Sequence, residues 1–348
     1  MKNILLTGAS GFLGQHFLHT LLEQHSDDDI HIVALHHSKP ELATALSPFG
    51  ARCVVVQLDL CDASTVAEWF AAGAARSFDY CIHTAALSSP KACAEDPTKA
   101  VAINVPRSFF KHLRQHHPNC HVIALSTDQV YSGTQPQGSM YTEDNDDTAV
   151  GPCNEYARTK RQLEEFLLHE QQPSYGATTI LRSSILLGPP PTYCSTHSTF
   201  LDFCASRATT PTTYWTNEIR SVMAVADVCA ILYALLVTTT TAPTATPNAS
   251  SVTVYNMGGP QPVSRHDMAR AVLTTAKGLR AAQDVDRLAI AAVKPAEDTT
   301  SPLQIAMDSS KLRAALPQLP PFRTLEDMVL LTLGEHNSSG GALENCRC

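Results

Sequence analysis

The first half of the chain alternates short apolar runs, rich in β-branched residues, with longer stretches of helical pattern. The runs of strand length cover residues 3–8, 30–36, 53–59, 80–86, 121–127 and 178–188. The helical patterns between them cover residues 11–24, 65–75, 98–116 and 156–170. This order is typical of consecutive βαβ units, in which helices cover both faces of a parallel sheet. We therefore predict an α/β fold built on a doubly wound parallel sheet.

The second half of the chain follows a less regular pattern. A buried helix is predicted over residues 225–237 and a strand over residues 251–259. A further helix follows, with Ser264 as its N-cap and Asp267 in its first turn. Residues 238–251 are rich in threonine and lack an apolar period, which predicts a flexible surface loop whose role the sequence leaves open.

These patterns predict two structural units. The first is a Rossmann-type dinucleotide-binding domain, and the second is a smaller C-terminal substrate-binding lobe. The boundaries that we predict are residues 1–180 with 221–258 for the Rossmann-type domain, 181–220 with 259–333 for the lobe, and 334–348 for a disordered tail.

Composition narrows the class of protein. The formal net charge is −8, from 25 basic and 33 acidic residues, which argues against a nucleic-acid binder because such proteins carry a basic surplus. The 11 cysteines have irregular spacings without a CxxC motif, so we expect reduced, mostly buried thiols in a cytoplasmic protein. The first apolar run is too short for a signal peptide or a membrane span. We predict no nucleic-acid or membrane partner, and no metal site.

A glycine turn, "TGASGFLG", separates the first strand from the first helix. Glycine lets the backbone approach a pyrophosphate closely, and the start of the helix offers free N–H groups to the phosphates. The spacing is GxxGxxG, and its place at the first strand of a βαβ pattern favours cofactor binding over a merely tight turn. The cofactor contacts expected here are Gly8, Ser10, Gly11, Phe12, Leu13 and Gly14.

The second strand ends without the acidic residue that usually binds the ribose hydroxyls of NAD. Instead His36, His37 and Lys39 cluster there, which suits a 2′-phosphate. We therefore predict NADP(H) over NAD(H), the alternative being that these are solvated loop residues. Asp59 with Leu60, after the third strand, is expected to reach the adenine ring. Small residues after the fourth strand let the cofactor cross the sheet edge, namely Thr84, Ala85 and Ala86.

Tyr156 and Lys160 lie four residues apart on a predicted helix and so share a face. A lysine ammonium beside a phenol favours the phenolate, which predicts a lowered pKa for Tyr156. Such a tyrosine can exchange a proton with a sugar or ketone oxygen. The stretch "ALSTDQVYSG" places Thr127 at the carboxyl end of a predicted parallel strand, where active sites of this fold lie. Tyr131 lacks a lysine four residues on, since position 135 is Gln.

With these motifs, the chain resembles the extended short-chain dehydrogenases/reductases. The resemblance rests on "TGASGFLG", "LDL", "HTAA", "INV", "STD", "YARTK" and "LRSSILLGP", in that order. It looks most like the branch of dTDP-4-dehydrorhamnose reductase and the regulatory β subunit of methionine adenosyltransferase. The resemblance implies that Thr127 polarises a substrate carbonyl, Tyr156 is the acid/base and Lys160 supports it. Further contacts implied are Asn104, Tyr156, Lys160, Ser184 and Ile185 toward the cofactor, and Asp128 and Arg220 toward the substrate.

Two activities follow from this resemblance. The first is an NADPH-dependent reductase of a nucleotide-linked 4-keto sugar, in which Tyr156 protonates the developing alkoxide. Gln129 and Ser132 depart from the reductase pattern, and the stretch "SPLQIAMDSSKL" lacks the expected arginine. The alternative is an NADP-binding regulatory subunit of a methionine adenosyltransferase, because "EIRSVMAVADV" and "MDSSKL" are similar to that protein. A second alternative is a sugar-nucleotide epimerase or dehydratase. A homodimer is compatible with each.

Overall fold

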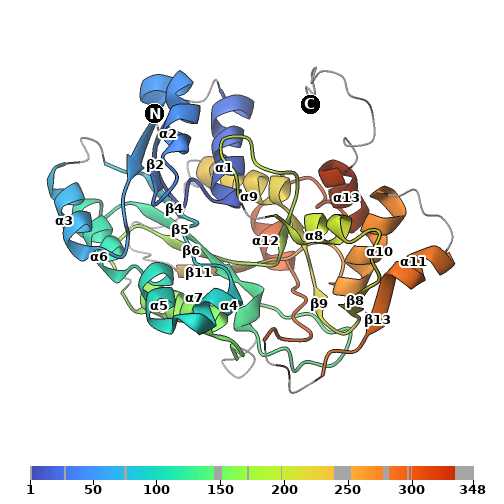
Figure 1. The fold of residues 1–348 in the computed structure, drawn as a ribbon. Helices are drawn as coiled ribbons and strands as arrows, with labels where there is room; N and C mark the ends of the chain where they lie inside the picture. The colour runs from blue at the N-terminus through green and yellow to red at the C-terminus, as the bar shows by residue number, and fades with distance from the viewer. Residues whose placement is uncertain are drawn as a thin grey trace.

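The computed structural model describes residues 2–26, 29–73, 77–144, 151–170, 172–196, 198–238, 252–276, 282–295, 298 and 300–333. Within these residues, one sheet of seven parallel strands has the order β11-β6-β5-β4-β1-β2-β3 (Figure 1). Its strands are β1 (Lys2–Thr7), β2 (Ile30–His36), β3 (Cys53–Gln57), β4 (Tyr80–His83), β5 (His121–Thr127), β6 (Thr178–Ser183) and β11 (Val252–Met257). The predicted α/β class with a doubly wound parallel sheet is confirmed.

Helices cover both faces of the sheet (Figure 1). Successive side chains of a strand point to opposite faces, and in β1 Ile4 and Leu6 join one apolar core whereas Leu5 joins the other. The first core includes side chains of α1 (Phe12–His19), α2 (Glu41–Leu46), α9 (Val225–Thr238) and α12 (Ser310–Ala315). The second includes side chains of α3 (Ala63–Ala71), α6 (Arg107–His116) and α7 (Glu155–His169).

Two predicted helices are divided in the structure. The helix predicted over residues 98–116 is split into α5 (Pro97–Asn104) and α6, because Pro106 cannot donate a helical hydrogen bond. The helix predicted over residues 11–24 changes from α1 to a π-helical turn, η1 (Thr20–Gln24). Short helical segments that the sequence did not predict include α2, η2 (Ser47–Arg52) and α4 (Pro90–Glu95).

A smaller group of elements lies beside the sheet, on the right of Figure 1, with a core of its own. Its helices are α8 (Phe200–Ser206), α10 (Arg265–Ala276), α11 (Ala282–Leu288) and α13 (Leu325–Leu333). Its short strand pairs are β7 (Leu186–Leu187) with β10 (Met223–Ala224), β8 (Thr212–Trp215) with β13 (Ala289–Ala292), and β9 (Ile219–Arg220) with β12 (Val263–Ser264). We propose that the predicted domain boundaries describe this division.

The predicted cap of α10 is confirmed. The Ser264 hydroxyl accepts from the Asp267 N–H at 3.0 Å, and the Asp267 carboxylate accepts from the Ser264 N–H at 2.8 Å. The tail over residues 334–348 and residues 239–251 of the predicted threonine-rich loop lie outside the described residues.

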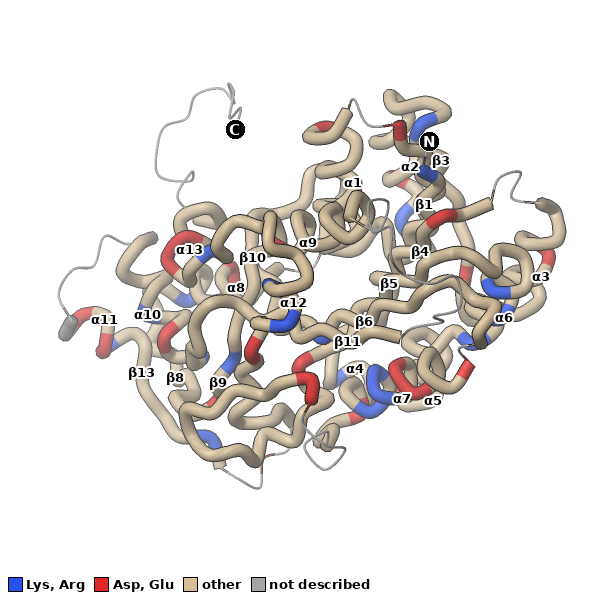
Figure 2. Tube along the Cα trace, turned by 180° about the vertical axis from the view of Figure 1, so that it is seen from behind, with Lys and Arg blue, Asp and Glu red and all other residues tan. Residues whose placement is uncertain are grey.

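Three general features bear on function. Acidic and basic residues are interspersed along the chain, as Figure 2 shows on α7. The nine cysteines of the described ranges are free thiols, buried apart from Cys61 and Cys153. None of the helices in the described part of the chain combines the length and the apolar character that a membrane crossing needs.

Candidate functional site

The glycine turn after β1 brings the backbone close to the end of β4. Gly8 has a φ of 68°, which favours glycine, and a Cβ atom there would lie 2.6 Å from the backbone nitrogen of Ala85. A Cβ on Gly14 would lie 2.3 Å from the Gly8 carbonyl oxygen. Gly11 is the N-cap of α1 and has no side chain that could accept from the first N–H groups of this helix. The first turn of α1 also carries no acidic residue. A phosphate fits this helix start.

A cleft of about 540 Å³ opens between the glycine turn, the ends of β2 and β3, and α5. It lies at the carboxyl ends of the strands, where the strand order reverses between β1 and β4, and doubly wound sheets bind dinucleotides at such a point. The predicted cofactor residues that line it are Gly8, Ser10, Gly11, His36, His37, Asp59, Leu60, Thr84, Ala85 and Ala86. The position of the cleft fits a dinucleotide.

The remaining predicted cofactor residues do not line this cleft: Phe12, Leu13, Gly14, Lys39, Asn104, Tyr156, Lys160, Ser184 and Ile185. The sequence reasoning in turn missed Leu35, Ser38, Leu58, Cys61, Leu87, Lys99, Ala102 and Ile103, which do line it. Lys99, Ala102 and Ile103 have the i, i+3, i+4 spacing of one helix face. That spacing is a signal in the sequence that could have identified the α5 wall.

The three basic residues predicted at the end of β2, His36, His37 and Lys39, lie in different surroundings and do not all face the cleft. His36 is buried, and its Nδ1 accepts from the Lys39 N–H at 3.3 Å. The exposed His37 places Nε2 3.6 Å from an Asp59 carboxylate oxygen. The Lys39 ammonium lies 3.6 Å from Glu41 and not in the cleft. Of the predicted phosphate contacts, His36 and His37 therefore face the cleft, together with the unpredicted Lys99.

The three predicted catalytic residues lie at the end of β5 and in the first turns of α7. Thr127 is the last residue of β5, and Tyr156 and Lys160 lie one helical turn apart in α7. The Thr127 side chain acts to lower the pKa of the Tyr156 phenol. The Thr127 hydroxyl also donates to the Asp128 carboxylate at 3.1 Å and accepts from the Gln129 N–H at 3.2 Å.

The pKa of Tyr156 differs from the sequence prediction. Burial raises the pKa of this phenol and the nearby Asp128 raises it further, while Thr127 acts in the opposite direction. The prediction of a lowered pKa is wrong, because burial favours the neutral phenol and Asp128 repels the phenolate. The protonated, neutral form of Tyr156 is therefore favoured.

Lys160 is nearly inaccessible, with 2% of its surface exposed. Burial lowers the pKa of Lys160 to about 8, and Glu164 acts in the opposite direction. His83, at the end of β4, is also buried, and burial together with the Lys160 charge lowers the pKa of His83 to about 3. The His83 ring is thus neutral, and its Nδ1 is 2.8 Å from the Thr7 hydroxyl.

Asn154 fixes the start of α7 and was not identified from the sequence. As N-cap, its side-chain oxygen accepts from the Ala157 N–H at 2.9 Å. Its amide nitrogen donates to the Gln129 side-chain oxygen at 2.8 Å and to the Thr300 carbonyl at 3.2 Å. Gln129 therefore connects the turn after β5 to the helix that carries Tyr156.

Asn104 supports the same helix from α5. Its side-chain oxygen accepts from the Leu87 N–H at 2.7 Å, and its nitrogen donates to the Thr159 hydroxyl at 2.8 Å. Asn104 is fully buried, so these bonds link the loop after β4 to α7.

Asp128 and Arg220, the predicted substrate contacts, are both buried and face one another. The Asp128 carboxylate accepts from the Ser184 hydroxyl at 2.8 Å and lies 4.0 Å from the Arg220 Nε. Burial raises the pKa of Asp128, and Arg220 opposes that rise. The Arg220 Nη atoms donate to the carbonyls of Leu303 at 3.1 Å and Pro302 at 2.7 Å. Arg220 therefore links the turn after β5 to Pro302 and Leu303 of the smaller lobe.

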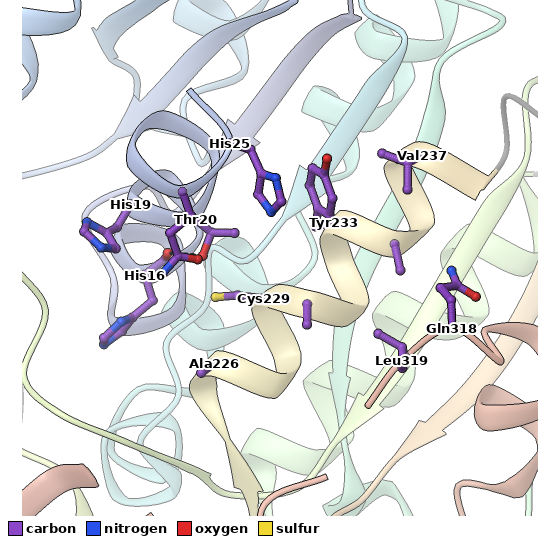
Figure 3. A pocket seen from close by; sticks show the side chains of 13 residues that line it. His16, His19, Thr20, His25, Ala226, Cys229, Tyr233, Val237, Gln318 and Leu319 are labelled. Carbon is purple, nitrogen blue, oxygen red and sulfur yellow. Dashed lines mark hydrogen bonds between the residues drawn. The ribbon is translucent and has the colours of Figure 1, made fainter. Parts of the chain in front are cut away.

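A second cavity, of about 310 Å³, lies between α1, η1 and α9 (Figure 3). His25 and Tyr233 stack there with ring centroids 3.6 Å apart. Ala226, Cys229 and Val237 from α9 form its apolar side. None of the predicted site residues lines this cavity. Within the described ranges, no group of three His, Cys, Asp or Glu side chains could hold a metal ion.

Comparisons with known proteins agree with this geometry. A model of the "NAD dependent epimerase/dehydratase family" matches residues 4–258. A dTDP-glucose 4,6-dehydratase of Mycobacterium tuberculosis (strain CDC 1551 / Oshkosh) is 29% identical over 191 residues, which are 53% of this chain and 54% of that protein. The chain thus matches about half the length of these curated relatives.

Solved structures show the same fold. The UDP-glucose 4-epimerase of Bifidobacterium longum, in complex with NAD+ and UDP, has a TM-score of 0.73 at 19% identity, covering 97% of this chain and 99% of that one. The dTDP-4-dehydrorhamnose reductase of Bacillus anthracis str. Ames, in complex with NADP, has a TM-score of 0.66 at 17% identity, covering 97% and 100%.

Fold and cleft define a dinucleotide-binding α/β protein. The chain belongs to the NAD dependent epimerase/dehydratase family. We predicted an enzyme of the oxidoreductase type that uses a nicotinamide dinucleotide. Membership of this family confirms that prediction.

Proposed function

We propose that the chain catalyses hydride transfer between a nicotinamide dinucleotide and a carbon atom of a nucleotide-linked sugar. The observation that carries this proposal is the placement of Thr127 at the carboxyl end of β5 and of Tyr156 and Lys160 in the first turns of α7, at the sheet edge that also holds the cleft. Tyr156 exchanges a proton with the sugar oxygen, Thr127 donates a hydrogen bond to that oxygen, and Lys160 supplies positive charge. The bound cofactor gives or accepts the hydride.

Among such reactions, we favour an epimerase or dehydratase. The relatives at 28–29% identity are dTDP-glucose 4,6-dehydratases, and the family model carries the same two activities. In both reactions, a sugar hydroxyl is first oxidised and the cofactor later returns the hydride. Tyr156 therefore acts as a base in one half of the cycle and as an acid in the other.

A reductase is the second candidate, as the branch resemblance implied. Two observations favour it. Tyr156 is held as a neutral phenol, the form that protonates an alkoxide. The end of β2 carries His36 and His37 instead of a carboxylate, and both line the cleft with Lys99. We propose NADP(H) as the preferred cofactor for the same reason, with His37 and Lys99 nearest its 2′-phosphate.

One experiment separates these activities. The purified chain is incubated with UDP-glucose, UDP-glucuronate and dTDP-glucose in the presence of NAD+ or NADP+, and the products are analysed by mass spectrometry and chromatography. A product lighter by one water indicates a dehydratase, and an isomer of equal mass indicates an epimerase. Oxidation of NADPH with a dTDP-4-keto-6-deoxy sugar indicates a reductase. If no sugar is converted and Tyr156→Phe behaves as the wild type, the proposed function is wrong.

The regulatory alternative, a partner of a methionine adenosyltransferase catalytic subunit, stays a prediction. So do the homodimer and the cytoplasmic location. A pull-down with a methionine adenosyltransferase tests the first, since a regulatory subunit would form a complex and alter the kinetics of its partner. Gel filtration tests whether the chain forms a homodimer. Loss of Tyr156 would leave such a complex intact, whereas it would abolish sugar turnover.

A further inference from the structure

Tyr156 lies in the part of α7 that depends most on support from outside the helix. It is the second residue of the helix, which begins at Glu155. The first N–H groups of a helix have no partner within the helix, and helix ends fray. The position of the Tyr156 side chain therefore depends on what holds the N-cap residue, Asn154.

Asn154 joins three segments of the chain. Its Oδ1 accepts from the Ala157 N–H at 2.9 Å. Its Nδ2 donates to the Gln129 side-chain oxygen at 2.8 Å and to the Thr300 carbonyl oxygen at 3.2 Å. The Ala157 N–H can only donate and the Thr300 carbonyl can only accept, so these two groups fix the orientation of the buried amide. An amide is the side-chain group that accepts on one side and donates on the other.

Gln129 extends this connection to the end of β5. Its side-chain oxygen accepts from Asn154, and its backbone N–H donates to the Thr127 hydroxyl at 3.2 Å. A single residue thus connects the N-cap of α7 to the Thr127 hydroxyl. The position of Thr127 relative to Tyr156 is set across this connection.

The Thr300 carbonyl belongs to a segment of the smaller lobe that is firmly held. The hydroxyl of the next residue, Ser301, accepts from the Arg220 Nη2 at 2.6 Å, and the Ser301 carbonyl accepts from the Lys294 ammonium at 2.6 Å. Both cations are buried, and hydrogen bonds from charged donors are stronger than neutral ones. Thr300 therefore moves together with this part of the lobe, and Asn154 is a contact through which such a movement reaches α7.

We propose that Asn154 is a positioning residue, which fixes Tyr156 relative to Thr127 and transmits the position of residues 300–303 to both. The role of Tyr156 in turnover rests on the proposed function. The connection through Asn154 is a property of the folded chain, and it can be measured without a substrate. A residue that only caps the helix needs its acceptor and not its donor, so variants that keep the acceptor alone separate the two roles.

The experiment is NMR of the full chain with ¹³Cζ-labelled tyrosine, with the Tyr156 signal assigned from Tyr156→Phe. Asn154→Asp has the same shape and remains a good N-cap, but it places a carboxylate oxygen against the Thr300 carbonyl. Gln129 can turn its own amide to donate to this carboxylate, so Asn154→Asp acts mainly on the contact with the lobe. Asn154→Ser also remains a good N-cap, and it loses both donated bonds.

In both variants, the Tyr156 signal is expected to shift by more than its linewidth, because the phenol moves relative to Thr127. Asp62→Ser is the matched control: Asp62 is the N-cap of α3, and its replacement should leave the Tyr156 signal in place. If the chain converts a sugar, Asn154→Ser is expected to lower kcat by up to ~100-fold with a smaller change in KM, because small misplacements of reacting groups are costly.

Ser301→Ala tests the connection from the side of the lobe. It removes the hydrogen bond from Arg220 to the Ser301 hydroxyl and leaves the residues of α7 unchanged. We expect it to shift the Tyr156 signal in the otherwise wild-type chain, but not in Asn154→Ser, where the connection is already broken. A shift of equal size in both backgrounds, or in neither, overturns the transmission from residues 300–303.

The outcomes separate this inference from the proposed function. An unshifted Tyr156 signal in folded Asn154→Asp and Asn154→Ser proteins overturns the inference, even if a sugar is converted. Shifted signals support it even if no sugar is converted, in which case the proposed function alone fails. Should neither Asn154 variant fold, Ser301→Ala in the otherwise wild-type chain decides, and an unshifted Tyr156 signal there overturns the inference.

Discussion

At one end of the site, Lys160 and Glu164 are buried and their surroundings are fixed by hydrogen bonds from three strands. At the other end, where the cleft runs past β2 and β3, the His37 and Asp59 side chains are 71% and 47% exposed and pair at 3.6 Å. Buried charges interact strongly, whereas exposed charges are screened by water and salt. We therefore expect that substitutions of side chains have the larger effects at the proposed catalytic end of the site. At the proposed cofactor end, we expect the larger effects from changes in backbone geometry.

The largest effect is expected at Tyr156. Tyr156→Phe removes the proposed proton donor and should lower kcat by ~10²- to 10⁴-fold, with NADPH affinity changed little. Steady-state kinetics and a fluorescence titration with NADPH measure the two quantities. Tyr193→Phe is the control, because Tyr193 is also partly buried but lies beside His19, which lines the second cavity. A Tyr156→Phe protein with more than a tenth of the wild-type kcat would contradict the comparison.

Lys160 should give stability a dependence on pH. Its pKa is about 8 in the folded chain, against ~10.4 in an unfolded one. Between these values the unfolded state binds more protons, so the stability of the wild type relative to Lys160→Met rises with pH, by up to ~3 kcal/mol. Urea denaturation at several pH values between 7 and 10.5 measures this difference. Lys99→Met is the control at an exposed residue, and the difference between its unfolding free energy and that of the wild type should not change with pH.

The glycine turn tests the importance of backbone at the cofactor end. Gly14→Ala places a Cβ 2.3 Å from the Gly8 carbonyl oxygen and should cost about 1–3 kcal/mol of unfolding free energy. Gly11→Ala meets that oxygen at 3.1 Å and should cost less. Thermal and urea unfolding of both variants measure which of them loses more unfolding free energy. Equal losses would mean that the close approach at Gly14 is relieved by a backbone shift.

The smallest effect is expected at His37. His37→Ala should weaken NADPH binding by no more than about fivefold, because an exposed ionic contact contributes ~0–1 kcal/mol. The loss should shrink in high salt and should not occur for NADH. Calorimetric titrations with both cofactors at two salt concentrations provide the measurement. A large, salt-independent loss would show that the cofactor end also depends on a desolvated side chain.

Local patterns predicted much of the sheet. The strands at residues 30–36 and 121–127 have the predicted bounds, because each is an apolar run between polar turns. The break between α5 and α6 was visible in the sequence as Pro106, yet the helical period on both sides concealed it.

The site was less predictable because its properties depend on contacts between distant segments. Tyr156 and Lys160 follow from a four-residue spacing, but their pKa values depend on burial and on Asp128 and Glu164. The pairing of Glu164 with Arg182 joins a helix to a strand, and local periodicity does not reveal such a partner. The residues of α5 that line the cleft, Lys99, Ala102 and Ile103, have the spacing of one helix face, but the sequence analysis did not predict them.

The seventh strand of the sheet also has a consequence for synthesis. β11 pairs with β6 through Val252–Met257, after the chain has passed through β7, α8 and α9. Until the ribosome has released these residues, β6 presents an unpaired edge, and such edges associate with other chains. A nascent or truncated chain ending before residue 252 should therefore depend on chaperones and aggregate readily when they are scarce.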